Sequence, residues 1–295
     1  MKRSFVSCFV ICGVFFIAEF AAERATDPSS TLSELVGVVS AQSTVDEKPE
    51  DPRPKRKLLP VSSKFFNQIE RITTAIDEEE DFEKAREILD QCLEQSKKWS
   101  ERELAMFHRR YANVGLLLED YDLTLEHLKK ILEYREFIQY FVEERALWVI
   151  ASLYATQSED YDTAIDYVQQ WLDLKNDWDE GSRHYAYIGG IYTNMEDYYK
   201  TEEWMSRAIA KANEESEEIP ETWSVQLLSA FTLIADENED NPTERDKYLQ
   251  KALDLSEQLV QKFVENEDYK KMLENINAKI SSATNDVLDE ESDAL

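Results

Sequence analysis

The segment Asp160-Tyr161-Asp162-Thr163-Ala164-Ile165 is the clearest copy of a pattern that recurs along this chain of 295 residues. An acidic residue followed by an aromatic one also occurs at Asp81-Phe82, Asp120-Tyr121 and Asp197-Tyr198. Successive aromatic residues are 39, 40 and 37 positions apart (82 to 121, 121 to 161, 161 to 198). Self-similarity at a nearly constant period is typical of repeat proteins, so this pattern predicts a repeat architecture.

Each acidic–aromatic pair opens an amphipathic segment. Counted from the aromatic residue, positions +7, +10 and +11 are Leu89, Cys92, Leu93, then Leu128, Ile131, Leu132, then Val168, Trp171, Leu172, then Met205, Ala208, Ile209. A fifth, degenerate copy after Asn241-Pro242 has Leu249, Ala252 and Leu253. Offsets of three and four residues place these side chains on one face of an α-helix.

A second helical segment lies upstream of each pair. The clearest is Ile188-Gly189-Gly190-Ile191-Tyr192, which matches Ile150-Ala151-Ser152-Leu153-Tyr154. The small residue, Gly189 or Ala151, allows a paired helix to approach closely. Each repeat is therefore predicted to be two antiparallel helices joined by a short acidic turn, and a nonrepetitive helical bundle is the alternative.

A single helix pair cannot bury its apolar face alone, so neighbouring pairs are expected to stack. The predicted fold class is all-α: an α-solenoid of about five helix pairs with a C-terminal capping helix near residues 269–280.

These residues resemble the tetratricopeptide (TPR) motif, in which a large–small–x–x–Tyr segment precedes Asp-Tyr or Asp-Phe and then Ala-Ile. The spacing departs from the usual 34 residues of that motif, and a closing proline is mostly missing, although Pro220 stands after the fourth copy. The resemblance implies that the α-solenoid is a right-handed, TPR-like superhelical domain over residues 62–282.

The N-terminus is typical of an export signal. Lys2 and Arg3 precede an apolar run from Phe5 to Ala18. This run is shorter than a membrane-spanning helix, which needs about 20 residues. We expect a signal peptide at 1–22 and a periplasmic location, with an uncleaved inner-membrane anchor as the alternative. A polar, disordered linker is expected at 23–61 and an acidic, disordered tail at 283–295. The one dense basic cluster, Lys55-Arg56-Lys57, is expected to be solvated, and contact with phospholipid headgroups is the alternative.

The net charge of the chain limits the classes of molecule that it is expected to bind. Asp+Glu 62 against Lys+Arg 33 gives a formal net charge of -29, which repels nucleic acid and anionic lipid. A protein partner with a basic segment or an exposed carboxylate is expected, although the charge is also explained by solubility alone. No small-molecule substrate is expected, and membrane contact is expected only through an uncleaved anchor.

Catalytic chemistry is not indicated. The histidines His108, His127 and His184 lack metal-ligand spacing to one another or to Cys92, and each is expected at a helix surface or between helices. Phosphate-binding glycine loops and serine-nucleophile motifs are absent from the sequence. We expect no cofactor, no metal and no enzymatic activity. Cys92, the one cysteine after signal removal, is expected to be buried as a small apolar residue.

In TPR proteins the first helix of each pair lines the inner groove. Aligning Ala112, Ala151 and Gly189 on that basis predicts a protein-binding groove formed by Arg109, Asn113, Arg145, Trp148, Ser152, Arg183 and Gly190. Arginine can hold a carboxylate through two hydrogen bonds, and tryptophan supplies a large anchor. The alternative is that the arginines pair with nearby acidic side chains and that Trp148 belongs to the core.

Residues from about 72 to 233 are also similar to TPR proteins that accompany bacterial TonB-type energy-transducing systems. The shared features include Tyr161-Asp162-Thr163-Ala164-Ile165-Asp166-Tyr167 before Gln170-Trp171-Leu172, and Pro220-Glu221-Thr222-Trp223 before an apolar helix. The resemblance implies a non-catalytic adaptor that helps inner-membrane motors act on outer-membrane transporters. A TPR scaffold of another envelope assembly or secretion machine is the second hypothesis, and an enzyme subunit is the remote one.

Overall fold

The fold is all-helical in the part of the chain that the computed structural model describes, residues 53–175 and 181–293. These residues form eleven α-helices and contain no strand, which confirms the predicted all-α class. Among these residues, no helix combines the length and apolar character that crossing a membrane requires. The signal peptide expected at 1–22 and most of the expected linker lie outside the described residues.

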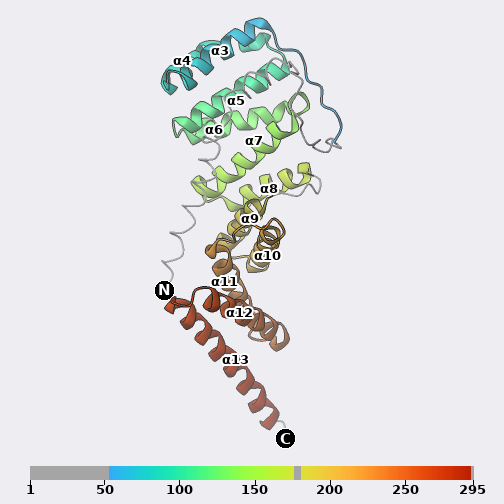
Figure 1. Ribbon diagram of the computed structural model, residues 1–295. Helices are drawn as coiled ribbons and strands as arrows, with labels where there is room; N and C mark the ends of the chain where they lie inside the picture. The colour runs from blue at the N-terminus through green and yellow to red at the C-terminus, as the bar shows by residue number, and fades with distance from the viewer. Residues whose placement is uncertain (1–52, 176–180, 294–295) are drawn as a thin grey trace. The chain divides into compact units, whose positions relative to one another are not determined.

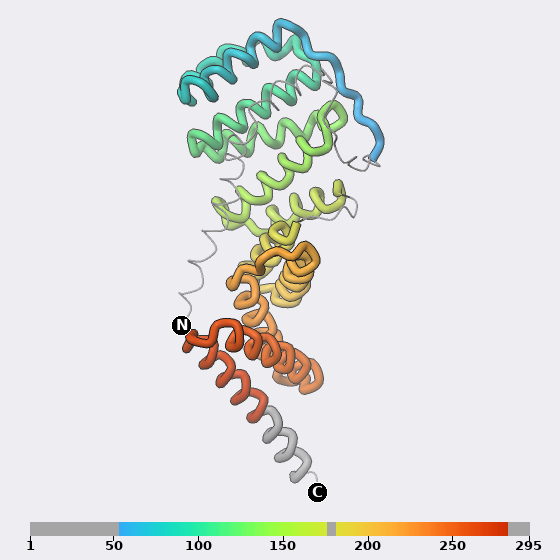
Figure 2. Tube along the Cα trace, viewed as in Figure 1, coloured from blue at the N-terminus to red at the C-terminus, as the bar shows by residue number. Residues whose placement is uncertain are grey.

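The chain divides into two compact units, Met1–Asp177 and Trp178–Leu295. Unit 1 contains the first six helices: α3 (Ser63–Asp77), α4 (Phe82–Leu93), α5 (Glu101–Leu117), α6 (Tyr121–Glu133), α7 (Tyr140–Leu153) and α8 (Tyr161–Lys175). Unit 2 contains α9 (Ser182–Asn194), α10 (Tyr198–Glu214), α11 (Glu221–Glu237), α12 (Pro242–Lys262) and α13 (Glu267–Asp293). Within each unit every helix packs against the next one along the chain (Figures 1 and 2).

The four acidic–aromatic turns share one backbone geometry. The residue before each aspartate is a glutamate with positive φ, between 51° and 59°: Glu80, Glu119, Glu159 and Glu196. The aspartate then caps the next helix, because its Oδ1 accepts the backbone N–H three residues later at 2.9–3.1 Å. A left-handed residue followed by an aspartate cap ends one helix and starts the next within three residues. The Glu-Asp-aromatic triplet is thus the local reason why the chain reverses at these points.

The apolar positions of the repeat are largely where the sequence places them. Residues at +7 and +10 are buried in all five copies. Position +11 varies: Leu132 is buried, whereas Leu93, the last residue of α4, is 48% exposed. At about 100° per residue, +11 lies at one edge of the apolar face, so its burial depends on which neighbour covers that edge.

Two glycines permit close helix packing. A Cβ atom on Gly115 of α5 would lie 2.6 Å from Thr124 Oγ1 of α6, and one on Gly189 of α9 would lie 2.7 Å from Met205 Sδ of α10. No side chain fits at the first position without movement of the partner helix. The prediction that Gly189 admits a close neighbour is confirmed.

The helical region extends further at its C-terminal end than the repeat domain predicted over residues 62–282. Helix α13 continues to Asp293, beyond residue 282, where we expected the domain to end. Residues 53–61, the last part of the predicted linker, lie against unit 1 and are described below. Cys92 is buried, as predicted, and its Sγ lies 3.4 Å from Gln68 Oε1. Burial raises the pKa of the Cys92 thiol.

Candidate functional site

The seven residues predicted to form a groove are divided between the two units. Arg109 and Asn113 lie on α5, and Arg145, Trp148 and Ser152 lie on α7, all in unit 1. Arg183 and Gly190 lie on α9 of unit 2.

Several of these residues are interior. Trp148 is 8% exposed and packs on Trp171 of α8 with ring centroids 4.7 Å apart, while Ser152 is 2% exposed. Gly190 is buried within α9. Arg109 is exposed and Arg145 is half-buried. Arg109 and Arg183 are thus the exposed members of the predicted set, and Asn113 is half-buried like Arg145. Trp148 packs as a core residue.

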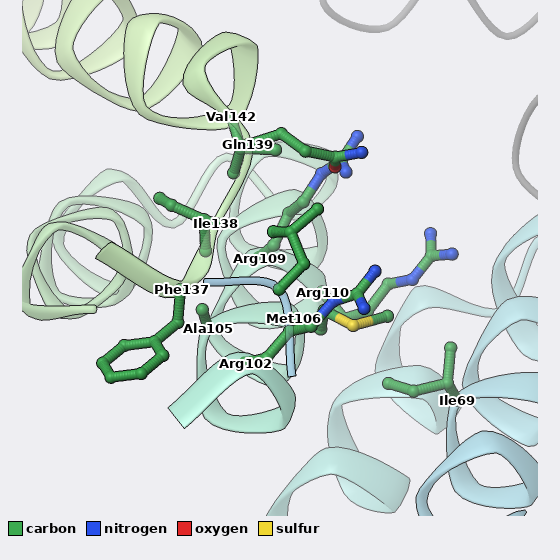
Figure 3. A pocket seen from close by; sticks show the side chains of 11 residues that line it. Ile69, Arg102, Ala105, Met106, Arg109, Arg110, Phe137, Ile138, Gln139 and Val142 are labelled. Atoms are coloured by element: carbon green, nitrogen blue, oxygen red, sulfur yellow. The ribbon is translucent and has the colours of Figure 1, made fainter. Parts of the chain in front are cut away.

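Unit 1 contains a cavity between α5 and the start of α7, with a volume of about 90 Å³ (Figure 3). Its lining mixes apolar side chains with three arginines and comprises Leu58, Ile69, Arg102, Ala105, Met106, Arg109, Arg110, Phe137, Ile138, Gln139 and Val142. Arg109 also places its guanidinium 5.9 Å from the ring centroid of Phe141. The cavity therefore combines apolar contact area with cationic groups at its edge.

Residues 53–61, which we call the arm, run across this face of unit 1 from α3 towards α8 (Figure 2). Leu58 of the arm lines the cavity itself. Arg102 Nη1 of α5 donates a hydrogen bond to the Leu59 carbonyl at 2.8 Å, and the Lys57 amide donates to the Glu136 carbonyl at 3.2 Å. The arm thus occupies unit 1 as a bound peptide would, without helical structure of its own.

The end of the arm nearest the helices is anchored on a buried carboxylate. The amide of Ser62 donates to Glu103 Oε1 at 2.8 Å, and Glu103 Oε2 accepts from the Ser100 amide at 2.9 Å. Burial acts to raise the pKa of Glu103, but the hydrogen bonds from Ser62 and Ser100 outweigh it and lower the pKa. Glu103 therefore stays ionised and joins the arm to the N-terminus of α5.

Two arm arginines are held at the start of α7. The guanidinium groups of Arg53 and Arg56 lie 4.0 Å and 3.6 Å from the centroid of the same ring, that of Tyr140. Arg56 forms an ion pair with Glu143, whose side chain is 3% exposed. Arg53 forms an ion pair with Glu144 at 2.5 Å. We call Tyr140, Glu143 and Glu144 the arginine site.

This site was missed in the sequence because its partners are 91 and 87 positions apart along the chain. The available signal was charge: Arg53-Pro54-Lys55-Arg56-Lys57 is basic in an otherwise acidic chain. Such a segment is attracted to adjacent carboxylates, and Glu143-Glu144 is one of several such pairs. The sequence does not say which pair is selected.

A buried histidine pair was also missed. His108 of α5 and His127 of α6 are 7% and 5% exposed, and their Nδ1 atoms lie 2.8 Å apart. One Nδ1 must donate and the other accept, so at most one proton lies between them. Burial, reinforced by neighbouring charges, lowers the pKa of His108 to about 3 and that of His127 to about 4. Both imidazoles are neutral at pH 7.

The contacts on this face are of kinds that proteins use to bind extended segments. Within residues 53–175 and 181–293, no group of three or more His, Cys, Asp or Glu side chains is arranged to hold a metal ion. The contacts described here are ion pairs, cation–π contacts and hydrogen bonds to carbonyls, which are the contacts that hold an extended peptide. Comparison with known protein families and with curated proteins finds no match to this chain.

Proposed function

We propose that the protein is a non-catalytic adaptor, in which unit 1 binds an extended segment of a protein partner. The observation that carries this proposal is the arm itself. Residues 53–61 cross the face formed by α5 and α7 and are held by side chains and carbonyls of the helical framework. A surface that accepts one extended segment has the shape and hydrogen-bonding groups to accept another.

The composition of the cavity supports the same function. It presents apolar area from Met106, Ile138 and Val142 beside the guanidinium of Arg109. A partner segment is therefore expected to combine an apolar side chain, which fills the cavity, with a carboxylate or carbonyl that Arg109 recognises. The net charge of -29 adds a general attraction for basic partners.

The type of repeat, the cellular location and the partner system are proposed from the sequence resemblance to TPR proteins. We propose that the helix pairs are TPR-like and form a right-handed superhelix. We further propose that the protein acts in the bacterial envelope, in the periplasm, as an accessory of a TonB-type system. A scaffold of another envelope or secretion assembly is the alternative. Impaired uptake of iron complexes or vitamin B12 in a deletion strain supports the TonB assignment, and normal uptake excludes it.

The binding function is tested by affinity capture from envelope extracts with quantitative mass spectrometry. Wild type is compared with Arg109→Ala/Arg145→Ala, two accessible or half-buried positions of unit 1. The matched control is Arg207→Ala, an exposed arginine of unit 2. We expect a partner whose recovery falls at least tenfold with the double variant and stays unchanged with the control. Equal recovery with all three proteins contradicts the assignment of binding to this face.

A further inference from the structure

We propose that the arginine site recognises an extended segment with two arginines three residues apart, and that the arm is an intramolecular competitor which a partner of the same chemistry displaces. This inference deepens the proposed binding function and rests on it. It names the partner as an exposed Arg-x-x-Arg segment with a proline between the arginines.

Each of the two arm arginines makes three kinds of contact with the rest of unit 1. Arg56 pairs with Glu143, places its guanidinium 3.6 Å from the Tyr140 centroid and donates through Nη1 to the Ile138 carbonyl at 3.3 Å. Arg53 repeats this set with other partners: Glu144, the same ring at 4.0 Å, and the Leu174 carbonyl at 3.1 Å. A planar guanidinium makes all three kinds of contact at once, whereas an ammonium group does so poorly.

The neighbouring lysines differ from the two arginines in burial. Lys55 and Lys57 flank Arg56 and are exposed, whereas Arg53 and Arg56 are half-buried. The backbone between the arginines is held as well, because the Tyr140 hydroxyl donates to the Pro54 carbonyl at 3.0 Å. Proline fixes φ and has no N–H that the site would have to satisfy. The selected pattern is therefore Arg-Pro-x-Arg in an extended conformation.

Each carboxylate of the arginine site also lies near a cation that does not belong to the arm and that stays when the arm leaves. Arg135 Nε lies 3.5 Å from Glu143 Oε1, and Lys175 Nζ lies 2.9 Å from Glu144 Oε2. A buried carboxylate with no cation is strongly unfavourable, which would lock the arm in place. With one resident cation for each carboxylate, removal of the arm leaves the site electrically balanced. This arrangement permits exchange of the arm for another segment.

The arm is attached to unit 1 through a small number of separate contacts. The amide of Lys57 donates to the Glu136 carbonyl, and the carbonyls of Pro54 and Leu59 accept from Tyr140 and Arg102. These separate hydrogen bonds add to the contacts of the two arginine side chains. The arm is continuous with α3, which begins at Ser63. A tethered segment has an effective concentration on the order of millimolar, enough to exclude weak ligands and to yield to strong or multivalent ones.

The test is fluorescence anisotropy with a labelled peptide of the sequence Asp-Pro-Arg-Pro-Lys-Arg-Lys-Leu-Leu-Pro, which is that of residues 51–60. The protein is the full chain, either wild type or Arg53→Ala/Arg56→Ala, which removes the competitor and leaves the site intact. We expect the variant to bind the peptide at least tenfold more tightly than wild type. A second peptide carries lysine at both arginine positions, and we expect it to bind the variant at least tenfold more weakly than the first.

Three outcomes overturn the inference. Equal binding to wild type and variant removes the competition, and equal binding of the two peptides removes the selectivity for arginine. Loss of helical circular dichroism in the variant shows that the arm is a required part of the fold rather than a displaceable one. If the inference fails in any of these ways while partner capture still depends on Arg109 and Arg145, the proposed binding function stands without it.

Discussion

Acidification is expected to destabilise unit 1 through the His108–His127 pair. The two imidazoles are in contact through their Nδ1 atoms and are enclosed by aromatic rings. Tyr111 stacks on His127 with centroids 4.0 Å apart, and Tyr134 stacks on His108 at 6.3 Å. A second proton on this pair would place two positive charges side by side in the core, so the folded state resists protonation.

Whether acid stabilises or destabilises unit 1 depends on the histidine pKa values in the folded and the unfolded chain. Burial is the largest cause that lowers both pKa values, to about 3 for His108 and about 4 for His127. Among charged neighbours, Lys130 lowers both values, whereas Glu126 raises both and Asp90 raises that of His127. The unfolded chain protonates near pH 6.5, so between pH 6.5 and about 4 it binds more protons than the folded state. Stability is therefore lost as the pH falls through this window.

The magnitude can be worked out at pH 5.5, one unit below the ordinary histidine pKa of 6.5. Protonation of each unfolded imidazole then favours unfolding by about 1.4 kcal/mol, and the pair together by about 3 kcal/mol. Domains of this size have a total stability of about 5–15 kcal/mol, so the loss is large enough to measure.

The assay is urea unfolding at pH 7.5 and pH 5.5, read by hydrogen exchange in peptides from α5 and α6. His108→Gln/His127→Gln removes both titrating groups, while the many carboxylates stay the same in both proteins. We expect wild type to lose about 3 kcal/mol more than the double variant between the two pH values. His184→Gln, in unit 2, serves as the control and should behave as wild type. An identical pH dependence in wild type and double variant refutes the reasoning.

Two further predictions concern the helix turns and the close helix contact. Gly115→Ala should lower the free energy of unfolding of unit 1 by about 1–2 kcal/mol, because its Cβ would meet Thr124 Oγ1, which is itself bonded to the Asp120 carbonyl at 2.8 Å. Gly189→Ala should have a smaller effect on unit 2, since the flexible end of Met205 can move aside; urea unfolding compares the two, and a larger loss at Gly189 contradicts this account. Asp160→Ala should destabilise the α7–α8 turn by about 1 kcal/mol through loss of the cap on Thr163, measured by hydrogen exchange of α8, whereas Asp166→Ala on the exposed side should change little.

The helix turns and the buried helix faces could be predicted because they depend on residues close together in the sequence. The acidic–aromatic pairs predicted the short turns, and the aspartate of each pair caps the next helix. The left-handed glutamate before each aspartate was not predicted, because glutamate does not favour positive φ. The buried faces also follow from the sequence at +7 and +10. Leu93 shows the limit, because an edge position is buried only if a neighbouring element covers it.

The contacts at the candidate site could not be predicted, because they depend on the packing of segments far apart in sequence. His108 and His127 meet only in one rotational register of α5 against α6, which apolar spacing does not determine to within one side chain. The arm has the polar composition of a linker, and its attachment depends on two carboxylates at the start of α7. Arg109 was predicted as a groove residue by aligning Ala112 with Ala151 and Gly189, and the structure places it in the lining of the cavity.

The claim that unit 1 binds a partner segment is tested most directly by photocrosslinking in the native cells. A benzoylphenylalanine replaces Gln139, which lines the cavity of unit 1, and in a second strain it replaces Asp166, on the exposed side of α8. The account predicts one discrete crosslinked partner from position 139, mapped by mass spectrometry to an extended segment and lost when Arg109→Ala/Arg145→Ala is introduced. The account is contradicted if position 139 crosslinks no partner, or if position 166 captures the same protein equally well.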